Sequence, residues 1–316
     1  MSITILDGGM GKELRRIGAP FRQPEWSALA LIEDPDAVVQ AHRNFIDAGA
    51  EVITTNNYAV VPYHLGDDDF DARGAELVEL AGRLARDAVD GTDVLVAGSM
   101  PPLFGSYEPQ HVDPVAAAPR YRTIAASLSP HVDIWLAETL STCVEVHSIM
   151  SAIEDVEASE ASACERRSVW VGFCFPDRWN AHGVALRSGE SAGDIAAAIA
   201  PHVDRIEAVL VNCTIPEQTD DALGALHREF AQAGLDVRTG AYANAFPLLE
   251  NPTYRANNTI LERRTDLTPD RYVDFARRWV AAGVSIVGGC CDMYPDHIAA
   301  LADAFAKHGE TENSPT

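Results

Sequence analysis

Two kinds of hydrophobic pattern alternate along the whole chain. Short runs rich in β-branched residues predict strands, and the longer alanine-rich segments between them carry apolar residues at helical spacing, which predicts helices. Strands are expected at 3–6, 51–55, 93–98, 133–138, 168–175, 207–213, 237–243 and 285–289. Helices are expected at 35–48, 70–89, 113–129, 142–157, 191–201, 217–233, 269–282 and 295–307.

The boundaries of these segments carry residues that suit helix ends. Asp34 and Thr268, each followed by proline, are expected N-caps, and glycine follows several helices in the sequences AGA, AGL and AGV. Eight strands alternating with eight helices predict an α/β fold, a (β/α)8 TIM barrel, as one domain over 1–309 with a disordered tail at 310–316. An open, doubly wound sheet is the alternative, but the first strand lacks the GxGxxG turn of a dinucleotide site.

Composition and charge limit the classes of function. The 316 residues are 47% hydrophobic, enough for a large core, and their formal net charge of −23 disfavours nucleic-acid binding, which needs a basic face. No apolar run approaches the roughly 18 residues of a membrane helix, and the N-terminal sequence lacks the pattern of a signal peptide. We therefore expect a cytoplasmic protein that acts on small molecules, and its oligomeric state is left open.

In a barrel of this kind, the residues that follow the strands meet at one end and form the active site. The expected strand ends are rich in polar residues, glycine and cysteine, and nothing comparable gathers where the strands begin. The residues at these ends are Asp7, Gly8 and Gly9, then Thr55, Asn56, Asn57 and Tyr58, then Gly98 and Ser99, Glu138 and Thr139, Asn212 and Cys213, Asn244, and Gly289, Cys290 and Cys291.

Three of the six cysteines fall at these strand ends. Cys213 follows the sixth strand, and Cys290 and Cys291 follow the eighth, after two glycines that let the backbone bend. Three thiolates with one open position are typical of a catalytic zinc site, whereas a structural site has a fourth protein ligand. The alternatives are a non-catalytic barrel with such a closed structural zinc, a strained vicinal disulfide with a redox role, and burial of small apolar thiols.

Five segments together resemble the homocysteine S-methyltransferase family, which includes S-methylmethionine- and betaine-dependent enzymes and the N-terminal module of cobalamin-dependent methionine synthase. They are LDGGMGKEL at 6–14, ITTNNYAVVP at 53–62, LAETLS at 136–141, VNC at 211–213 and GGCCDMYPDHI at 288–298. The resemblance spans nearly the whole chain, and NC after the sixth strand combined with GGCC after the eighth is highly specific. It implies a (β/α)8 barrel and a methyltransferase that makes methionine from homocysteine.

The resemblance also implies how the metal site is built. Cys213, Cys290 and Cys291 match the cysteines that bind Zn²⁺, and the sulfur of homocysteine takes the fourth position as a thiolate. Coordination removes the proton of a thiol that is mostly protonated at neutral pH. Tyr58 matches a tyrosine that occupies the zinc before substrate arrives, although a tyrosine beside a proline-containing turn is just as often a packing residue.

Further residues match the part of the family site that holds the amino-acid end of homocysteine. Asp7, with the amides of Gly8 and Gly9, matches the loop that binds this end, and Glu138 matches the carboxylate that pairs with the substrate ammonium. Asp7 has an alternative role as the cap of the next helix. Asn212 is expected to orient the loop after the sixth strand by hydrogen bonds.

The methyl donor is a cation in this kind of displacement, and aromatic faces bind such cations. Trp26 and Tyr107, with Phe104 nearby, lie in loops that can cover the barrel mouth. Thr139 stands where the betaine enzymes carry an aromatic residue, so a sulfonium such as S-methylmethionine or S-adenosylmethionine is favoured over betaine. Selenohomocysteine or another small thiol is the alternative acceptor. The long segment 244–264 is expected to form a lid or a partner surface.

Overall fold

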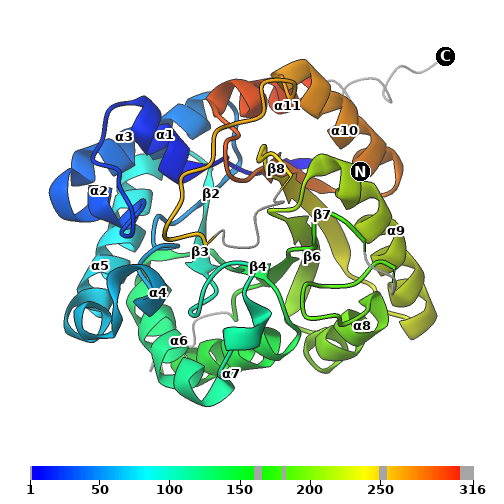
Figure 1. Cartoon of the computed structure of the whole chain (residues 1–316), viewed down its shortest axis with the longest axis horizontal. Coiled ribbons are helices and arrows are strands. Elements are labelled where there is room, and N and C mark those ends of the chain that lie inside the picture. Colours follow the sequence, from blue (N-terminus) through cyan, green and yellow to red (C-terminus); the bar gives the residue numbers. More distant parts are fainter. Residues whose placement is uncertain (1, 160–165, 180–182, 249–254, 307–316) are drawn as a thin grey trace.

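The computed structural model describes residues 2–159, 166–179, 183–248 and 255–306, in which eight parallel strands form a barrel surrounded by helices (Figure 1). The strands are β1 Thr4–Ile5, β2 Val52–Thr54, β3 Leu95–Met100, β4 Ile134–Leu140, β5 Val169–Phe173, β6 Ile206–Asn212, β7 Arg238–Ala243 and β8 Ile286–Gly289. The α-helices are α1 Met10–Arg16, α2 Ala28–Glu33, α3 Pro35–Asp47, α4 Pro62–Leu65, α5 Asp67–Val89, α6 Pro114–Leu128, α7 Val144–Ser159, α8 Ala192–Ile199, α9 Pro216–Ala233, α10 Pro269–Ala281 and α11 Pro295–Ala306. Short 3₁₀ turns occupy Pro109–His111, Ser129–His131 and Ala200–His202.

The strand order confirms the predicted TIM barrel and excludes the open sheet. Each strand pairs in parallel with its neighbours in the order β1-β8-β7-β6-β5-β4-β3-β2. A parallel bridge between Leu6 and Val52 then joins β1 to β2, which closes the sheet on itself. All eight predicted strands are present. The eight predicted helices do not include α1, α2 or α4, because helices of seven, six and four residues are too short to show a helical period.

The predicted helix ends are also present. The side chain of Asp34 accepts the amide N–H of Ala37, and the side chain of Thr268 accepts that of Arg271. Three glycines that follow helices, Gly49, Gly234 and Gly283, adopt positive φ angles. These local signals fix where each helix stops and hence where the next strand begins.

Apolar side chains fill the barrel interior, so the pore is a packed core with no channel. All eight strands or the residues next to them contribute. The interior side chains include Leu6, Val52, Ala97, Leu136, Trp170, Leu210, Tyr242 and Ile286. A second, larger core lies between the strands and the surrounding helices. Because the interior is filled, a binding site has to lie above the core, in the loops that follow the strands.

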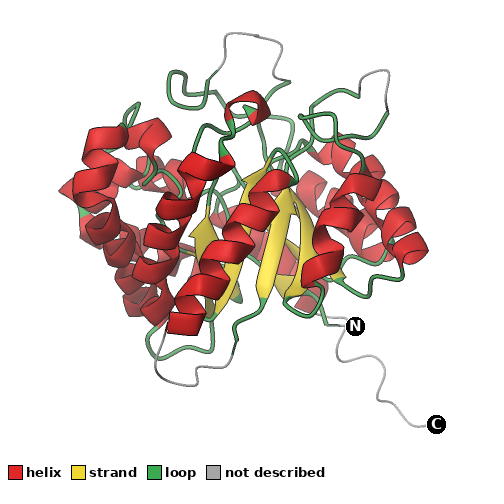
Figure 2. Cartoon of the chain, turned by 90° about the horizontal axis from the view of Figure 1, so that it is seen from below, coloured by secondary structure: helices red, strands yellow, loops and turns green. Residues whose placement is uncertain are grey.

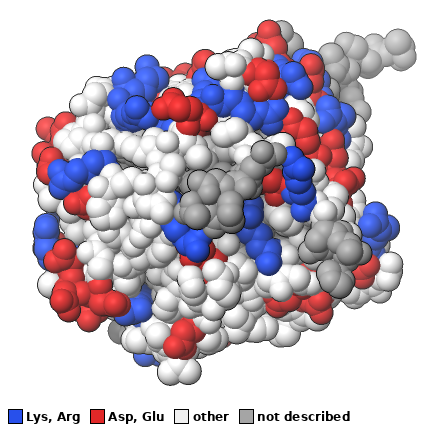
Figure 3. Space-filling view, viewed as in Figure 1, with Lys and Arg blue, Asp and Glu red and all other residues white. Residues whose placement is uncertain are grey.

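Figure 2 shows the barrel from the side, with the strands pointing toward a crown of loops that we call the mouth. Figure 1 looks onto this mouth. Charged side chains of both signs are interspersed around an uncharged area on this face (Figure 3). In the part of the chain that the structure describes, no helix is both long and apolar enough to cross a membrane. The predicted tail at 310–316 lies outside the described residues, as do 249–254 of the predicted lid segment.

Candidate active site at the barrel mouth

The three strand-end cysteines come together at the mouth. Cys213 directly follows β6, and Cys290 and Cys291 directly follow β8. Their three sulfur atoms all lie within 4.8 Å of one another, and those of Cys213 and Cys291 are 3.8 Å apart. Two sulfurs bound to one tetrahedral zinc at about 2.3 Å are separated by about 3.8 Å. The sulfur positions therefore fit a tetrahedral zinc ion.

Close packing of the backbone presents the cysteine pair. A Cβ atom on Gly289 would lie 2.4 Å from Met293 Cβ, and one on Gly288 would lie 2.4 Å from Leu6 Cβ. Neither glycine adopts a positive φ. The two glycines are thus required for close approach to Met293, before α11, and to Leu6, after β1, and not for the sharp bend that the sequence suggested. The Cys290 amide donates to the Ala243 carbonyl at 2.9 Å, which joins the β8 loop to β7.

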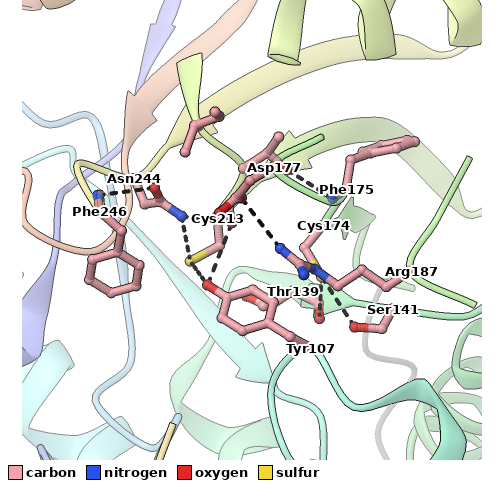
Figure 4. A network of polar contacts seen from close by, with 12 residues as sticks. Tyr107, Thr139, Ser141, Cys174, Phe175, Asp177, Arg187, Cys213, Asn244 and Phe246 are labelled. Carbon is pink, nitrogen blue, oxygen red and sulfur yellow. Dashed lines mark hydrogen bonds and ion pairs between the residues drawn. The ribbon is translucent and has the colours of Figure 1, made fainter. Parts of the chain in front are cut away.

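Cys213 is held in an unusual backbone conformation, with a φ of 45°. The side-chain amide of Asn244 donates to the Cys213 carbonyl at 2.8 Å, and the hydroxyl of Tyr107 donates to the Cys213 sulfur at 2.9 Å (Figure 4). Left-handed backbone in a residue other than glycine costs about 1 kcal/mol or more and persists only where neighbours enforce it. The conformation aims the sulfur at the cysteine pair.

Hydrogen bonding among the thiols polarises the cluster even without a metal. Hydrogen bonds from Cys290 and Cys291 hold the pKa of Cys213 well below its usual range. The same hydrogen bonds to Cys213 raise the pKa values of Cys290 and Cys291. One thiolate is therefore shared by three sulfurs, and a soft cation that displaces the remaining protons suits this donor set.

Two buried carboxyl groups form a second part of the site. Asp7 follows β1 and accepts the amide N–H of Thr54 at 2.7 Å, so it does not cap α1, whose N-cap is Gly9. Glu138, in β4, accepts the Ser99 hydroxyl at 2.5 Å. Burial raises the pKa of Asp7 to about 7 and that of Glu138 to about 8, and the repulsion between the two adds to the shift at Glu138. Buried carboxyls without a cationic partner are ready to bind one.

Cysteines, carboxyls and aromatic residues all line one cavity of about 850 Å³ that opens to solvent at the mouth. Its wall includes Asp7, Gly8, Gly9, Met10, Lys12, Trp26, Tyr58, Ser106, Tyr107, Glu138, Thr139, Cys213, Tyr242, Phe246, Ala256, Cys290 and Cys291. Every predicted site residue except Asn212 is therefore on one wall.

Comparison with known proteins supports this arrangement. The sequence profile of the homocysteine S-methyltransferase family matches residues 4–305. The chain belongs to this family. The homocysteine S-methyltransferase of Escherichia coli is 28% identical and covers 95% of this chain and 94% of its own length. A selenocysteine methyltransferase of Astragalus bisulcatus is 25% identical and covers 94% and 91%. The metallated crystal form of the Escherichia coli homocysteine methyltransferase MmuM superimposes with a TM-score of 0.71 at 26% identity over 96% of both chains.

The chain is therefore a homocysteine S-methyltransferase family enzyme with a cysteine cluster suited to a metal. Within the described ranges, no fourth histidine, cysteine, aspartate or glutamate joins the three cysteines, so the group has the open corner of a catalytic site. This argues against the closed structural zinc considered as an alternative.

The two tyrosines of the mouth make different contacts. The hydroxyl of Tyr58, matched to the family tyrosine at the zinc, pairs with the Ser106 hydroxyl at 2.7 Å. The hydroxyl of Tyr107, a residue predicted at the donor, donates to Cys213, and Arg187 covers the Tyr107 ring with its guanidinium carbon 4.4 Å from the ring centroid. One face of Tyr107 is thus already occupied by a cation of the chain.

Asn212 has a structural role between two strand ends. Its side-chain oxygen accepts the amide N–H of Thr139 at 3.0 Å, and its nitrogen donates to the Thr139 hydroxyl at 2.9 Å. Thr139 has a φ of 60°. Asn212 therefore holds the loop after β4 in its left-handed turn, rather than orienting its own loop after β6.

The sequence reasoning missed several wall residues, among them Lys12, Phe246 and Ala256. Phe246 and Ala256 come from the long segment after β7, whose path over the mouth no local pattern predicts. The Gln23 side chain donates to the Ala256 carbonyl at 2.9 Å, which fixes this segment on the loop that carries Trp26. Lys12 had a signal in the sequence, because lysine is nearly absent from the chain.

Proposed function

We propose that this protein transfers a methyl group from a sulfonium donor to the sulfur of L-homocysteine and so makes methionine. The convergence of three cysteine sulfurs without a fourth protein ligand among the described residues carries the proposal. Cys213, Cys290 and Cys291 would hold Zn²⁺, which when bound supplies a thiolate-forming site for the substrate sulfur. A closed site or an isolated vicinal pair would not offer that fourth corner.

The chain's own residues then bind and orient the acceptor. Asp7 and Glu138 are buried carboxyls on the same cavity wall, and they suit the ammonium group of an amino acid. Fixing that end leaves the substrate side chain directed at the cysteine cluster, which converts a bimolecular encounter into a positioned one. The Gly9 amide donates to the Met293 carbonyl at 2.9 Å, so it is engaged within the chain, whereas Gly8 also lies on this wall beside Asp7.

A cationic donor suits the rest of the cavity. The bond between a donor sulfur and its methyl carbon breaks as the bond to the acceptor sulfur forms, and a sulfonium leaves as a neutral sulfide. Trp26 offers an aromatic face for such a cation. Thr139 supplies no aromatic face beside Glu138, which favours a sulfonium over the more bulky quaternary ammonium of betaine.

A selenium acceptor is the second candidate function. The relative from Astragalus bisulcatus bears the name selenocysteine methyltransferase. A three-sulfur site prefers soft ligands, and a selenolate is softer than a thiolate. Selenocysteine or selenohomocysteine would then occupy the same corner as homocysteine, with the same carboxyls on the ammonium group.

Methionine formation by anaerobically purified protein of known zinc content tests the proposal. Homocysteine is the acceptor, and S-methylmethionine, S-adenosylmethionine and betaine are supplied in turn as donors. We expect methionine with a sulfonium donor and its loss on chelation of the metal. No methionine from any donor, with about one zinc per chain, would reject homocysteine as the acceptor and direct the assay to selenocysteine.

A further inference from the structure

Lys12 is a chemical exception in this chain. Of the 24 lysine and arginine residues, only Lys12 and Lys307 are lysines. The side chain of Lys12 is only 6% exposed, and it lines the cavity that holds the cysteine cluster. Burial of an ammonium group is costly unless it is paired. A compact cation has thus been placed inside the site of a strongly acidic protein that otherwise uses arginine.

The partners of Lys12 account for two of its three N–H groups. Its Nζ donates to the Leu261 carbonyl at 2.6 Å and lies 3.2 Å from Asp292 Oδ1. An ammonium group has three donors, and the residues that the structure describes provide no acceptor for the third. Because Lys12 faces the cavity, that donor is available to a molecule bound there.

Lys12 shares its wall with Trp26. Both residues also border a smaller hollow that adjoins the main cavity. The intervening Gly11 makes the arrangement compact, because a Cβ atom there would lie 2.2 Å from Trp26 Nε1. The first turn of α1 therefore brings an aromatic face and an ammonium group together, on elements different from those that carry Glu138.

We propose that Lys12 anchors the carboxylate of the methyl donor. The donor then carries charges of both signs: its methyl-bearing cation lies on Trp26, and its carboxylate binds Lys12. The inference rests on the proposed function. It assigns the carboxyl groups Asp7 and Glu138 to the acceptor and Lys12 to the donor. In a chain of net charge −23, a carboxylate needs such a local cation to enter the mouth.

A structural ion pair is the competing explanation, since Asp292 directly follows Cys291 and its contact with Lys12 ties the cysteine loop to α1. The two explanations differ in what they predict for ligands. An anchor discriminates between donors with and without a carboxylate, whereas a structural pair treats them alike. Hydrogen bonds to a charged group contribute about tenfold to a hundredfold in affinity.

Calorimetric binding of two matched sulfonium probes separates these cases. Dimethylsulfoniopropionate carries a carboxylate, and ethyldimethylsulfonium has the same cation without it. Both are titrated into the zinc-loaded protein without homocysteine, so no turnover occurs. We expect the wild type to bind the carboxylate probe about tenfold to a hundredfold more tightly, and Lys12→Met to bind both equally. Equal affinities in the wild type, or an unchanged ratio in Lys12→Met, would overturn the proposal.

A second variant guards against misfolding. Lys12→Met leaves the buried Asp292 without its cation. The double variant Lys12→Met with Asp292→Asn removes both charges and is measured beside it. The zinc content of both variants checks that the cysteine loop is intact. Both variants should lose the preference for the carboxylate probe and keep the KM for homocysteine.

A raised homocysteine KM with an unchanged probe ratio would place the anchor on the acceptor and reject the inference. Failure of the proposed function is observed separately. In that case the wild type would make no methionine, but the ratio of the two probe affinities could still be measured and would still test Lys12.

Discussion

At the lower end of the barrel, where the strands begin, two partly buried carboxylates are paired with arginines of the chain itself. Arg205 lies 2.7 Å from Glu157, and Arg238 lies 2.9 Å from Glu207. Burial alone would raise the pKa of Glu207, but hydrogen bonds from Arg238 and Trp170 outweigh it and lower the value. These two carboxylates are therefore paired before any ligand arrives.

At the upper end, two buried carboxyl groups lack a cationic partner among the described residues. Asp7 and Glu138 are more deeply buried than Glu207, yet the described residues give them hydroxyl and amide partners and no cation. All five described non-glycine residues with positive φ also gather at this end: Trp26, Tyr107, Thr139, Cys213 and Asp292. Strained backbone and uncompensated charge both cost stability, and their concentration at one end marks where a ligand completes the structure.

The largest expected effect comes from removing a cysteine of the cluster. Cys290→Ala leaves two sulfurs, which cannot hold a tetrahedral zinc with an open corner, so we expect bound zinc and methionine formation to fall to background. Metal analysis and the methyl-transfer assay check this. Cys143→Ala, a change at a buried thiol beside Glu190, is the matched control and should keep its zinc. Full turnover by a zinc-free Cys290→Ala protein would refute the metal site.

Substitutions at the two ends should separate stability from binding. Glu138→Gln removes the carboxyl group that would pair with the ammonium of the proposed acceptor, and we expect KM for homocysteine to rise about tenfold to a hundredfold. Burial raises the pKa of Glu138 from 4.5 to about 8. The contribution of this group to the free energy of unfolding therefore falls as pH rises from 4.5 to about 8. Its removal should therefore stabilise the fold at pH 7, by roughly 1–3 kcal/mol.

Arg205→Met is the counterpart at the lower end. It leaves Glu157 buried with Arg167 at 3.7 Å as its remaining cation, so we expect a loss of about 3 kcal/mol in the free energy of unfolding. The KM for homocysteine should not change. Denaturant unfolding and steady-state kinetics on both variants give the comparison. A KM effect at Arg205, or a destabilised Glu138→Gln, would contradict the assignment of the two ends.

A smaller effect is expected at Tyr107, which touches a cysteine sulfur rather than a substrate. Tyr107→Phe keeps the ring under Arg187 and removes the hydroxyl that donates to Cys213. Loss of a group that orients a metal ligand lowers metal affinity by about tenfold or somewhat more, which competition with a chelator measures. Tyr63→Phe is the control. It removes a hydroxyl that donates to Glu108, which is next to Tyr107 in the same loop but away from the sulfur, and it should leave zinc affinity unchanged. Equal effects of the two variants would assign Tyr107 to loop packing alone.

The sequence predicted the fold and the cysteine cluster for local reasons. Strand and helix periods are short-range signals, and the chemistry of Cys213, Cys290 and Cys291 follows from their position directly after strands whose ends must meet. The same reasoning could not choose between Tyr58 and Tyr107. Both lie in loops at the mouth, and which hydroxyl reaches a sulfur depends on how the loop after β3 packs against β6.

Two further details needed the folded chain. Asn212 was expected to act on its own loop, but it bonds Thr139, seventy-three positions away, a contact that no periodicity encodes. Lys12 was visible as one of two lysines, yet its burial against Leu261 depends on the path of the segment after β7. Long-range loop packing is therefore what the sequence left undetermined at this site.

The smallest expected effect is the pH dependence of binding at the two upper carboxyls. L-Methionine is the suitable probe, because it has the ammonium group of the acceptor but no thiol that titrates. At pH 7 the free protein holds Glu138 largely protonated, since burial raises its pKa to about 8, and pairing with an ammonium requires that proton to leave. Affinity should therefore rise as pH increases, by about fivefold between pH 7 and pH 8 through Glu138 alone.

Calorimetry in two buffers of different ionisation enthalpy should show release of the proton. Asp7, whose pKa is raised to about 7, adds to the effect below pH 7. Glu138→Gln should flatten the profile above pH 7, whereas Glu207→Gln, at the lower end, should leave it unchanged. Methionine affinity that is independent of pH in the wild type would mean that neither carboxyl pairs with the ammonium group. The open balance of charge at the upper end would then need another ligand to explain it.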